Sequence, residues 1–287
     1  MPHDHVHHAG PDGDRRVALA VGVNIVLTVA QVVGGLLSGS LALIADALHN
    51  LSDALSLIIA LVARRIARRP ADDQMTFGYG RAEVVAALVN LTTLIVLGLF
   101  LIYEGIGRLF DPQPIDGWIV VILAAIALVV DLVTAFLTYA MAKGSMNIRA
   151  AFLHNLADAL GSVGVIVAGT LVLLYDWRLV DPIVTLGIAA YILWHGVAEI
   201  GPAIRLLMLG TPPEVETWAV REAIDEVEGV ARISHLHLWQ IDEGKTSVEA
   251  RVVLIAGSDP VATARAVKAE LHDQFGIAHA TVEPQQD

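Results

Sequence analysis

The chain has 287 residues, of which 55% are hydrophobic, and its mean hydropathy is +0.64. This composition excludes an ordinary water-soluble domain and indicates a protein with several membrane spans. Cysteine is absent, so disulfides, zinc ribbons and thiolate copper sites are excluded, and any metal has to be bound by His, Asp and Glu. Most of the net charge of −12 lies after residue 210, and no basic stripe favours binding to nucleic acid.

The chain begins with a short polar segment that is rich in histidine. Residues 1–16 contain His3, His5, His7 and His8 and precede the first apolar run. A His-rich tract without cysteine can collect Zn²⁺ at low affinity, and we expect this role; the alternative is a disordered end without a function. No small-residue cleavage site follows the first apolar run, so we expect a retained membrane span and not a signal peptide.

Six apolar runs are long enough to cross the membrane. About 30 Å of hydrocarbon requires roughly 20 residues of helix. Polar turn sequences separate the runs, among them SGS at 38–40 and DPQP at 111–114. We therefore predict a membrane domain in residues 17–209 with six transmembrane helices. The expected spans are about 17–37, 41–63, 82–104, 116–141, 150–174 and 180–205.

The charges of the loops predict the orientation in the membrane. Arg15 and Arg16 precede the first span and Arg81 lies before the third, whereas the loops on the opposite side contain mostly Asp, including Asp176 and Asp181. Because Lys and Arg are enriched in cytosolic loops, both termini are predicted to lie in the cytosol. The short loops and the lack of a targeting peptide indicate a multi-pass protein in the lipid bilayer of a bacterial cytoplasmic (inner) membrane.

Residues 210–287 have the composition of a water-soluble domain. Their apolar pattern predicts the order helix–strand–strand–helix–strand, which is that of a small α+β domain with ferredoxin-like connectivity. A domain of about 75 residues has a limited core, so we expect it to form a homodimer and to serve in dimerisation and regulation. The expected elements are a helix at 214–228, strands at 230–241 and 247–256, a helix at 259–275 and a strand at 277–284.

The sequence HNLSD at 49–53 recurs as HNLAD at 154–158, and both copies lie inside apolar runs. On a helix, residues i and i+4 lie on one face with their Cβ atoms about 5–6 Å apart, so each His points the same way as its Asp. If the second and fifth spans pack together, the two pairs provide two imidazoles and two carboxylates, a sufficient ligand set for tetrahedral Zn²⁺. The candidate ligands are His49, Asp53, His154 and Asp158.

The alternative explanation is two separate His–Asp pairs that satisfy each other within one helix. Ionisable groups in a membrane persist when they pair, bind an ion or line a water-filled path. The repetition of the pair at equivalent depth on a second span favours the metal site. Small residues beside the pairs, such as Ser52 and Gly161, also permit close approach of the helices.

Longer segments around these pairs resemble a known family. They are SGSLALIADALHNLSDALSL, FGYGRAEVVAALVN, NIRAAFLHNLADALGSVGVIVAG, DPIVTLGIAAYIL, SHLHLW and HATVEP. With these segments the chain resembles the cation diffusion facilitators over nearly its whole length, and their zinc-exporting members in particular. The resemblance implies a homodimeric antiporter that moves Zn²⁺ out of the cytosol in exchange for protons. Its metal site would lie between the second and fifth helices, on the four residues of the two pairs.

Some members of this family hold a second metal in the loop between helices two and three, with an Asp and two His in a DxxHxxxH-like spacing. Here Asp72 is kept, but Met75 and Tyr79 stand at the His positions. We therefore expect no strong metal site in this loop, and Asp72 is the residual candidate for a weak one.

Zinc-binding members often also have the sequence HDLHxW in the first strand of the cytosolic domain. Here Ser234 and His235 replace the first two residues, and Arg251 stands where the second strand often carries His. We expect a degenerate, regulatory metal site; the alternative is an ordinary pair of partly buried histidines at a dimer surface. The candidate ligands are His235, His237, His279 and Glu283.

Three functions remain to be distinguished. The first is a secondary transporter for Zn²⁺, or for Co²⁺, Cd²⁺ or Ni²⁺, because affinity alone separates these ions poorly. The second is an intramembrane metallohydrolase, but the chain has no HExxH motif and no serine nucleophile with a convincing partner, so we expect no enzyme. The third is a membrane-tethered metal sensor, which would have no use for a paired site within the spans.

Overall fold

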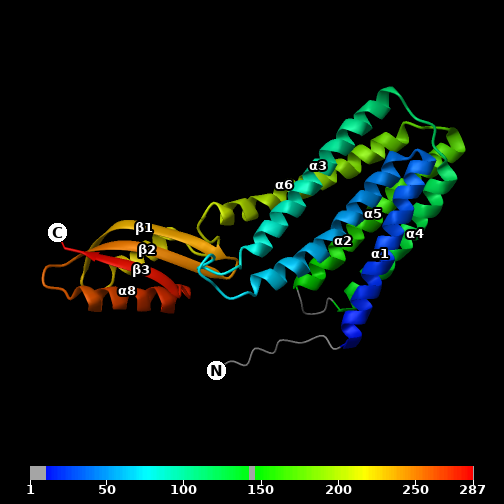
Figure 1. Cartoon of the computed structure of the whole chain (residues 1–287). Coiled ribbons are helices and arrows are strands. Elements are labelled where there is room, and N and C mark those ends of the chain that lie inside the picture. Colours follow the sequence, from blue (N-terminus) through cyan, green and yellow to red (C-terminus); the bar gives the residue numbers. More distant parts are fainter. Residues whose placement is uncertain (1–10, 142–145, 287) are drawn as a thin grey trace. The chain divides into compact units, whose positions relative to one another are not determined.

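The computed structural model describes the backbone of residues 11–141 and 146–286, and the side chains of residues 22, 25–56, 58–136 and 156–286. Within these residues the chain forms long helices followed by a small domain of helices and strands (Figure 1). The long helices are α1 (Pro11–Ser38), α2 (Leu41–Ala67), α3 (Ala82–Phe110), α4 (Gly117–Met141), α5 (Met146–Tyr175) and α6 (Val180–Leu207). The later elements are α7 (Thr217–Asp225), β1 (Val230–Asp242), β2 (Lys245–Leu254), α8 (Pro260–Phe275) and β3 (His279–Gln285).

The long helices have the character of membrane spans. Among the described residues, α2, α3, α4, α5 and α6 each contain a stretch long and apolar enough to cross a bilayer. In α1, the described apolar stretch Ile25–Ser38 is shorter than a span. The prediction of a helical membrane domain followed by a small ferredoxin-like α+β domain is confirmed.

Contacts divide the chain into two compact units. The first consists of Met1–Ile58 and Thr92–Val197, and the second of Ile59–Leu91 and Ala198–Asp287. The second unit thus contains the end of α2 and the start of α3 in addition to the cytosolic domain that the sequence predicts at 210–287. The predicted boundary at 209/210 was drawn from composition, whereas these units follow from contacts.

Helix α2 contributes buried residues to the packing of the first unit. Two clusters of buried apolar side chains lie on different faces of it, one shared with α4 and α5 and the other with α3 and α6. Its buried residues are small where neighbours come close, because Ala42 and Ala45 are both fully buried. Polar side chains on the buried part of this helix, such as Asp46 and His49, are therefore enclosed by other helices.

The first turn of α2 is held by a carboxylate from α6. Asp181 is 1% exposed and accepts hydrogen bonds from the Ser40 hydroxyl, from the backbone N–H of Leu41 at 2.9 Å and from that of Ala42 at 3.3 Å. The first N–H groups of a helix have no partner within the helix, and a negative charge there is favourable. Just before this turn, Arg108 of α3 donates to the carbonyl oxygen of Gly39.

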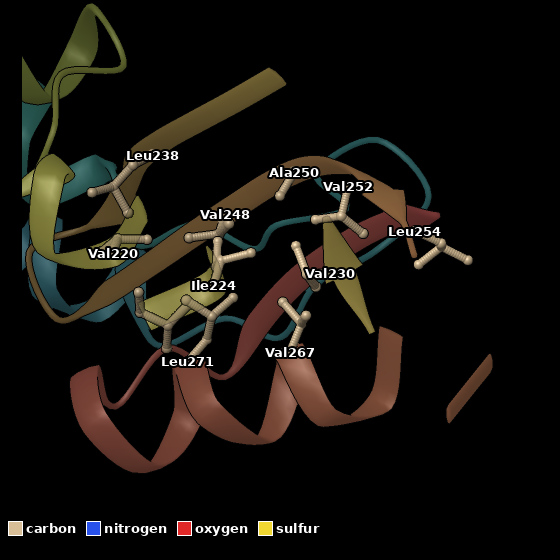
Figure 2. Packing of buried hydrophobic residues seen from close by; sticks show 11 residues of the cluster. Val220, Ile224, Val230, Leu238, Val248, Ala250, Val252, Leu254, Val267 and Leu271 are labelled. Carbon is tan, nitrogen blue, oxygen red and sulfur yellow. The ribbon is translucent and has the colours of Figure 1, made fainter. Parts of the chain in front are cut away.

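The sheet of the second unit has the order β1-β2-β3, with β1 and β2 antiparallel and β2 and β3 parallel. Figure 2 shows α8 beneath the strands, with Val267 and Leu271 directed toward Val248 and Val252. The helix is capped at its start by Asp259, whose side chain accepts from two backbone N–H groups of the first turn. It ends at Gly276, where φ is +67°, a conformation that favours glycine.

The loop between α2 and α3 packs against the hairpin of β1 and β2. Arg81 donates from Nε to the carbonyl oxygen of Ile241 at 2.8 Å and from Nη2 to that of Gln240 at 3.1 Å. The preceding residue, Gly80, lies so close to Asp242 that a Cβ atom on it would be 2.4 Å from the carboxylate. The residues Gly80 and Arg81 therefore pack closely against one end of the sheet.

Candidate metal centre

The described part of the chain brings together one residue group with the composition of a metal site, consisting of His49, Asp53 and Asp158. His49 and Asp53 lie one turn apart on α2, and Asp158 comes from α5, which runs beside α2 (Figure 1). The Nε2 atom of His49 is 3.1 Å from Oδ1 of Asp158 and 3.8 Å from Oδ2 of Asp53. Two helices that are more than a hundred residues apart in sequence thus meet through these side chains.

The spacing of these atoms suits a small divalent cation. One ligand atom of each residue lies within 4.8 Å of the ligand atoms of the other two. Zn²⁺ ligands at about 2.1 Å in a tetrahedron are about 3.4 Å apart, so side-chain rotations of small amplitude suffice to surround an ion.

The group is enclosed on the α5 side and more open at Asp53. His49 is 6% exposed and Asp158 is 9% exposed, whereas the side chain of Asp53 is 32% exposed. Charged groups in the low dielectric of a membrane interact strongly, and two carboxylates in such surroundings attract a cation or take up protons.

His154 precedes Asp158 by one turn on α5. Its side chain lies outside the described residues, so the fourth ligand that the repeated motif indicates stays a prediction.

A second layer of polar groups lies one turn from the centre. Asp46 of α2 is 3% exposed and accepts a hydrogen bond of 2.7 Å from Nε2 of Gln31 on α1. Asp131 of α4 accepts one of 3.1 Å from the hydroxyl of Ser162 on α5. These bonds join α1 to α2 and α4 to α5. The sequence analysis missed Asp131, although a single carboxylate in the apolar run of α4 is a signal of a functional or paired residue.

Comparison with known proteins identifies both parts of the chain. Residues 17–208 match the family described as "Cation efflux transmembrane domain", and residues 212–285 match "Cation efflux protein, cytoplasmic domain". The chain belongs to the cation efflux family. Proteins of this family are multi-pass membrane transporters and not enzymes, so the expectation that the chain is no enzyme and its resemblance to the cation diffusion facilitators are both confirmed.

Several relatives match nearly the whole chain. "Zinc transporter ZitB" of Pectobacterium atrosepticum is 36% identical over 285 residues, which cover 99% of this chain and 88% of the relative. "Cadmium, cobalt and zinc/H(+)-K(+) antiporter" of Bacillus subtilis is 35% identical over 260 residues, covering 89% of this chain and 83% of the relative. A solved structure described as "Metal-bound C-terminal domain of the CzcD transporter from Cuprividus metallidurans" is 29% identical, covers 25% of this chain and 99% of its own, and has a TM-score of 0.24.

In the loop between α2 and α3, Asp72 accepts hydrogen bonds that hold the backbone in place. One carboxylate oxygen accepts from the backbone N–H groups of Gln74 and Met75, and the other accepts from the hydroxyl of Tyr79 at 2.6 Å. The bond from Tyr79, followed by the two backbone bonds, lowers the pKa of Asp72, and the same bond raises the pKa of the Tyr79 hydroxyl. Tyr79 therefore acts in this loop as a hydrogen-bond donor to Asp72.

We predict that Asp72→Asn leaves the affinity and stoichiometry of zinc binding unchanged but loosens this loop. The amide cannot accept as many hydrogen bonds as the carboxylate, so amide hydrogen exchange at Gln74 and Met75 should become faster. Hydrogen exchange and zinc titration of the same purified protein test this. The substitution Asp73→Asn, at the neighbouring exposed residue, serves as the control. Loss of a bound zinc ion in Asp72→Asn alone would instead establish a metal site in the loop.

The candidate ligands of the C-terminal domain do not form one group in the described structure. His235 and His237 lie side by side on β1, with ring centroids 4.3 Å apart. Glu283 accepts a hydrogen bond of 2.7 Å from Nε of Arg251, and the ring of His279 packs against Phe77 at 5.5 Å between centroids. A metal at His235 and His237 would therefore have to displace Arg251 from Glu283 to gain that carboxylate.

The histidines of the N-terminal tail, His3, His5, His7 and His8, lie outside the described residues. Their role in collecting metal stays a prediction.

Proposed function

We propose that the protein exports divalent metal cations, Zn²⁺ first among them, from the cytosol in exchange for protons. The transport site of this proposal consists of His49, Asp53, His154 and Asp158. The approach of His49 on α2 to Asp158 on α5 at 3.1 Å carries the proposal, because it joins the two copies of the repeated motif across a helix interface. The membership of the chain in the cation efflux family supports transport out of the cytosol.

Coupling to protons follows from the chemistry of the ligands. A metal ion needs the histidine neutral and the carboxylates ionised, so protons and metal compete for the same atoms. A site that releases its metal on one side and takes up protons there exchanges the two ions as its access alternates. No separate proton carrier is required for this exchange.

The preference for Zn²⁺ rests on the ligand set and on relatives. Imidazole and carboxylate together suit Zn²⁺ in tetrahedral geometry, whereas an all-oxygen site would favour Mn²⁺. A relative that is 36% identical is named a zinc transporter, and others are named for cadmium and cobalt as well as zinc. Export of Co²⁺, Cd²⁺ or Ni²⁺ is the alternative within the same mechanism.

We also propose the cellular arrangement. The protein would be a homodimer in the cytoplasmic membrane with both termini in the cytosol, and residues 210–287 would serve in dimerisation and regulation. The match of residues 212–285 to a cytoplasmic domain of cation efflux proteins supports this assignment. Metal binding at His235 and His237 would modulate transport and not carry it, so His235→Ala should have a smaller effect than any substitution in the transport site.

The deciding experiment is zinc flux in proteoliposomes that contain the purified full-length protein, with and without an imposed pH gradient. Zinc uptake that is driven by the gradient, lost in Asp53→Ala and kept in Asp73→Ala would establish metal–proton antiport through the proposed site. Stoichiometric zinc binding without flux would overturn the transporter and favour the metal sensor. Flux that is insensitive to the pH gradient would overturn the coupling and leave the site in place.

A further inference from the structure

Helix α6 packs directly against the face of α2 that leads to the metal centre. Ala189 and Ile192 of α6 are almost fully buried in one cluster with Leu41 and Ala45 of α2. Tyr191 lies between these two α6 residues and is therefore carried on a well-packed stretch of helix. Its ring reaches the next turn of α2, at His49.

The ring of Tyr191 packs edge-on against the imidazole of His49. Their centroids are 6.0 Å apart and the ring planes are inclined by 86°. This T-shaped arrangement is a favourable geometry for two aromatic rings. On α6 the tyrosine has aromatic neighbours of its own, since His195 stacks on it at 6.4 Å with the planes 9° apart and Trp194 lies at 6.2 Å.

A ligand histidine needs support that does not use its ligand atom. In the described structure Nε2 of His49 contacts Asp158, but the same atom has to bind the metal, so this hydrogen bond is lost when an ion enters. The contact with Tyr191 involves the face and edge of the rings and leaves Nε2 available. It can hold the imidazole in one orientation both with and without the ion.

We propose that Tyr191 is a positioning residue that keeps the imidazole of His49 aimed at Asp53 and Asp158. This inference rests on the proposed function and extends the transport site to a third helix, α6. Without the ring, His49 has to be ordered at the moment of metal binding, which weakens affinity. The energy of an aromatic pair corresponds to a change of about twofold to tenfold in a dissociation constant.

The test compares Tyr191→Phe and Tyr191→Leu in the full-length protein. Zinc affinity is measured in detergent by competition with a fluorescent chelator, and KM and Vmax for zinc are measured in proteoliposomes. We expect Tyr191→Leu to raise the dissociation constant and KM about twofold to tenfold with Vmax within about twofold. Tyr191→Phe, which keeps the ring, should bind zinc like the unchanged protein.

Two further variants keep the outcomes separate. Tyr103→Leu makes the same change at a tyrosine of α3 that is 75% exposed, and it should not alter zinc affinity. His49→Ala removes the ligand itself. Unchanged affinity in Tyr191→Leu, with binding lost in His49→Ala, would overturn the positioning role alone. A loss in Tyr191→Phe equal to that in Tyr191→Leu would also overturn it, because the hydroxyl would then be the important group. Unchanged binding in His49→Ala would overturn the proposed transport site.

Discussion

Replacing Asp158 with alanine is expected to abolish zinc transport and to leave the protein folded. Asp158 is the only candidate ligand from α5 whose side chain is described, and it connects that helix to His49. Loss of a metal ligand should weaken zinc binding by more than the roughly hundredfold that loss of a ligand's supporting partner costs. The fold should survive, because the substitution also removes a carboxylate that is 9% exposed within the membrane.

The measurement is zinc flux in proteoliposomes, with size-exclusion chromatography of the same sample to show that the protein is intact. Asp158→Asn is the sharper variant, since the amide keeps the shape of the side chain and a hydrogen bond to His49 but is a poorer ligand. Flux within twofold of normal in Asp158→Asn and Asp158→Ala would exclude this residue from the transport site. If the Asp158→Ala protein aggregates and the Asp158→Asn protein does not, the flux of Asp158→Asn alone decides the test.

The second large effect is expected at Asp181, and it concerns stability. Asp181→Ala leaves the Ser40 hydroxyl and the N–H groups of Leu41 and Ala42 without their acceptor in a buried place. Each buried donor that loses its partner costs about 1–3 kcal/mol, so the free energy of unfolding should fall by at least about 3 kcal/mol. For a membrane domain of this size the midpoint of thermal unfolding should fall by about 6–12 °C.

Thermal unfolding in detergent, followed by tryptophan fluorescence, measures this change. Asp111→Ala is the matched control, because this exposed carboxylate accepts a hydrogen bond of 3.1 Å from Gln113 at the surface and should shift the midpoint by less than about 2 °C. Asp181→Asn keeps one acceptor and should lie between the two. A midpoint in Asp181→Ala equal to that of the control would show that the start of α2 is held by other contacts.

The repeated motif was predictable because its geometry is local. The spacing of His49 and Asp53 places both on one face of a helix, and the apolar runs predict the helices themselves. The pairing of α2 with α5 could be inferred only from the repetition of the motif. The distance of 3.1 Å between His49 and Asp158, and the greater exposure of Asp53, depend on packing that no local pattern encodes.

The roles of Asp181 and Tyr191 could not be found in this way. In the sequence, Asp181 counts as one more acidic residue at the non-cytosolic side, yet it is 1% exposed and its partners are about 140 residues away. Tyr191 stands in an apolar run without periodic polar neighbours. Both roles depend on which face of α6 meets α2, and this is decided by small residues such as Ala45 and Ala189.

The cytosolic domain was predicted more closely, since alternating and helical periods are distinct there. The first helix of this domain is shorter than expected, since it spans Thr217–Asp225 and not 214–228. The backbone of Glu216 is extended, so this residue is the N-cap and the helix starts after it. The strands and α8 lie within a few residues of their predicted places. The anchoring of the α2–α3 loop on the hairpin was not predicted, since a bond from Arg81 to backbone oxygens leaves no trace in side-chain patterns.

The close fit of Gly80 and Arg81 to the β1–β2 hairpin restricts how transporters of this kind can be recombined. A chimera that takes only the residues after 209 from a relative would place a foreign hairpin against the native loop. The match between position 80 and the hairpin would then be lost, because Asp242 leaves no space for a Cβ atom on Gly80. A chimera should fold when Ile59–Leu91 is exchanged together with Ala198–Asp287, because the loop and the hairpin that contact each other then come from the same protein.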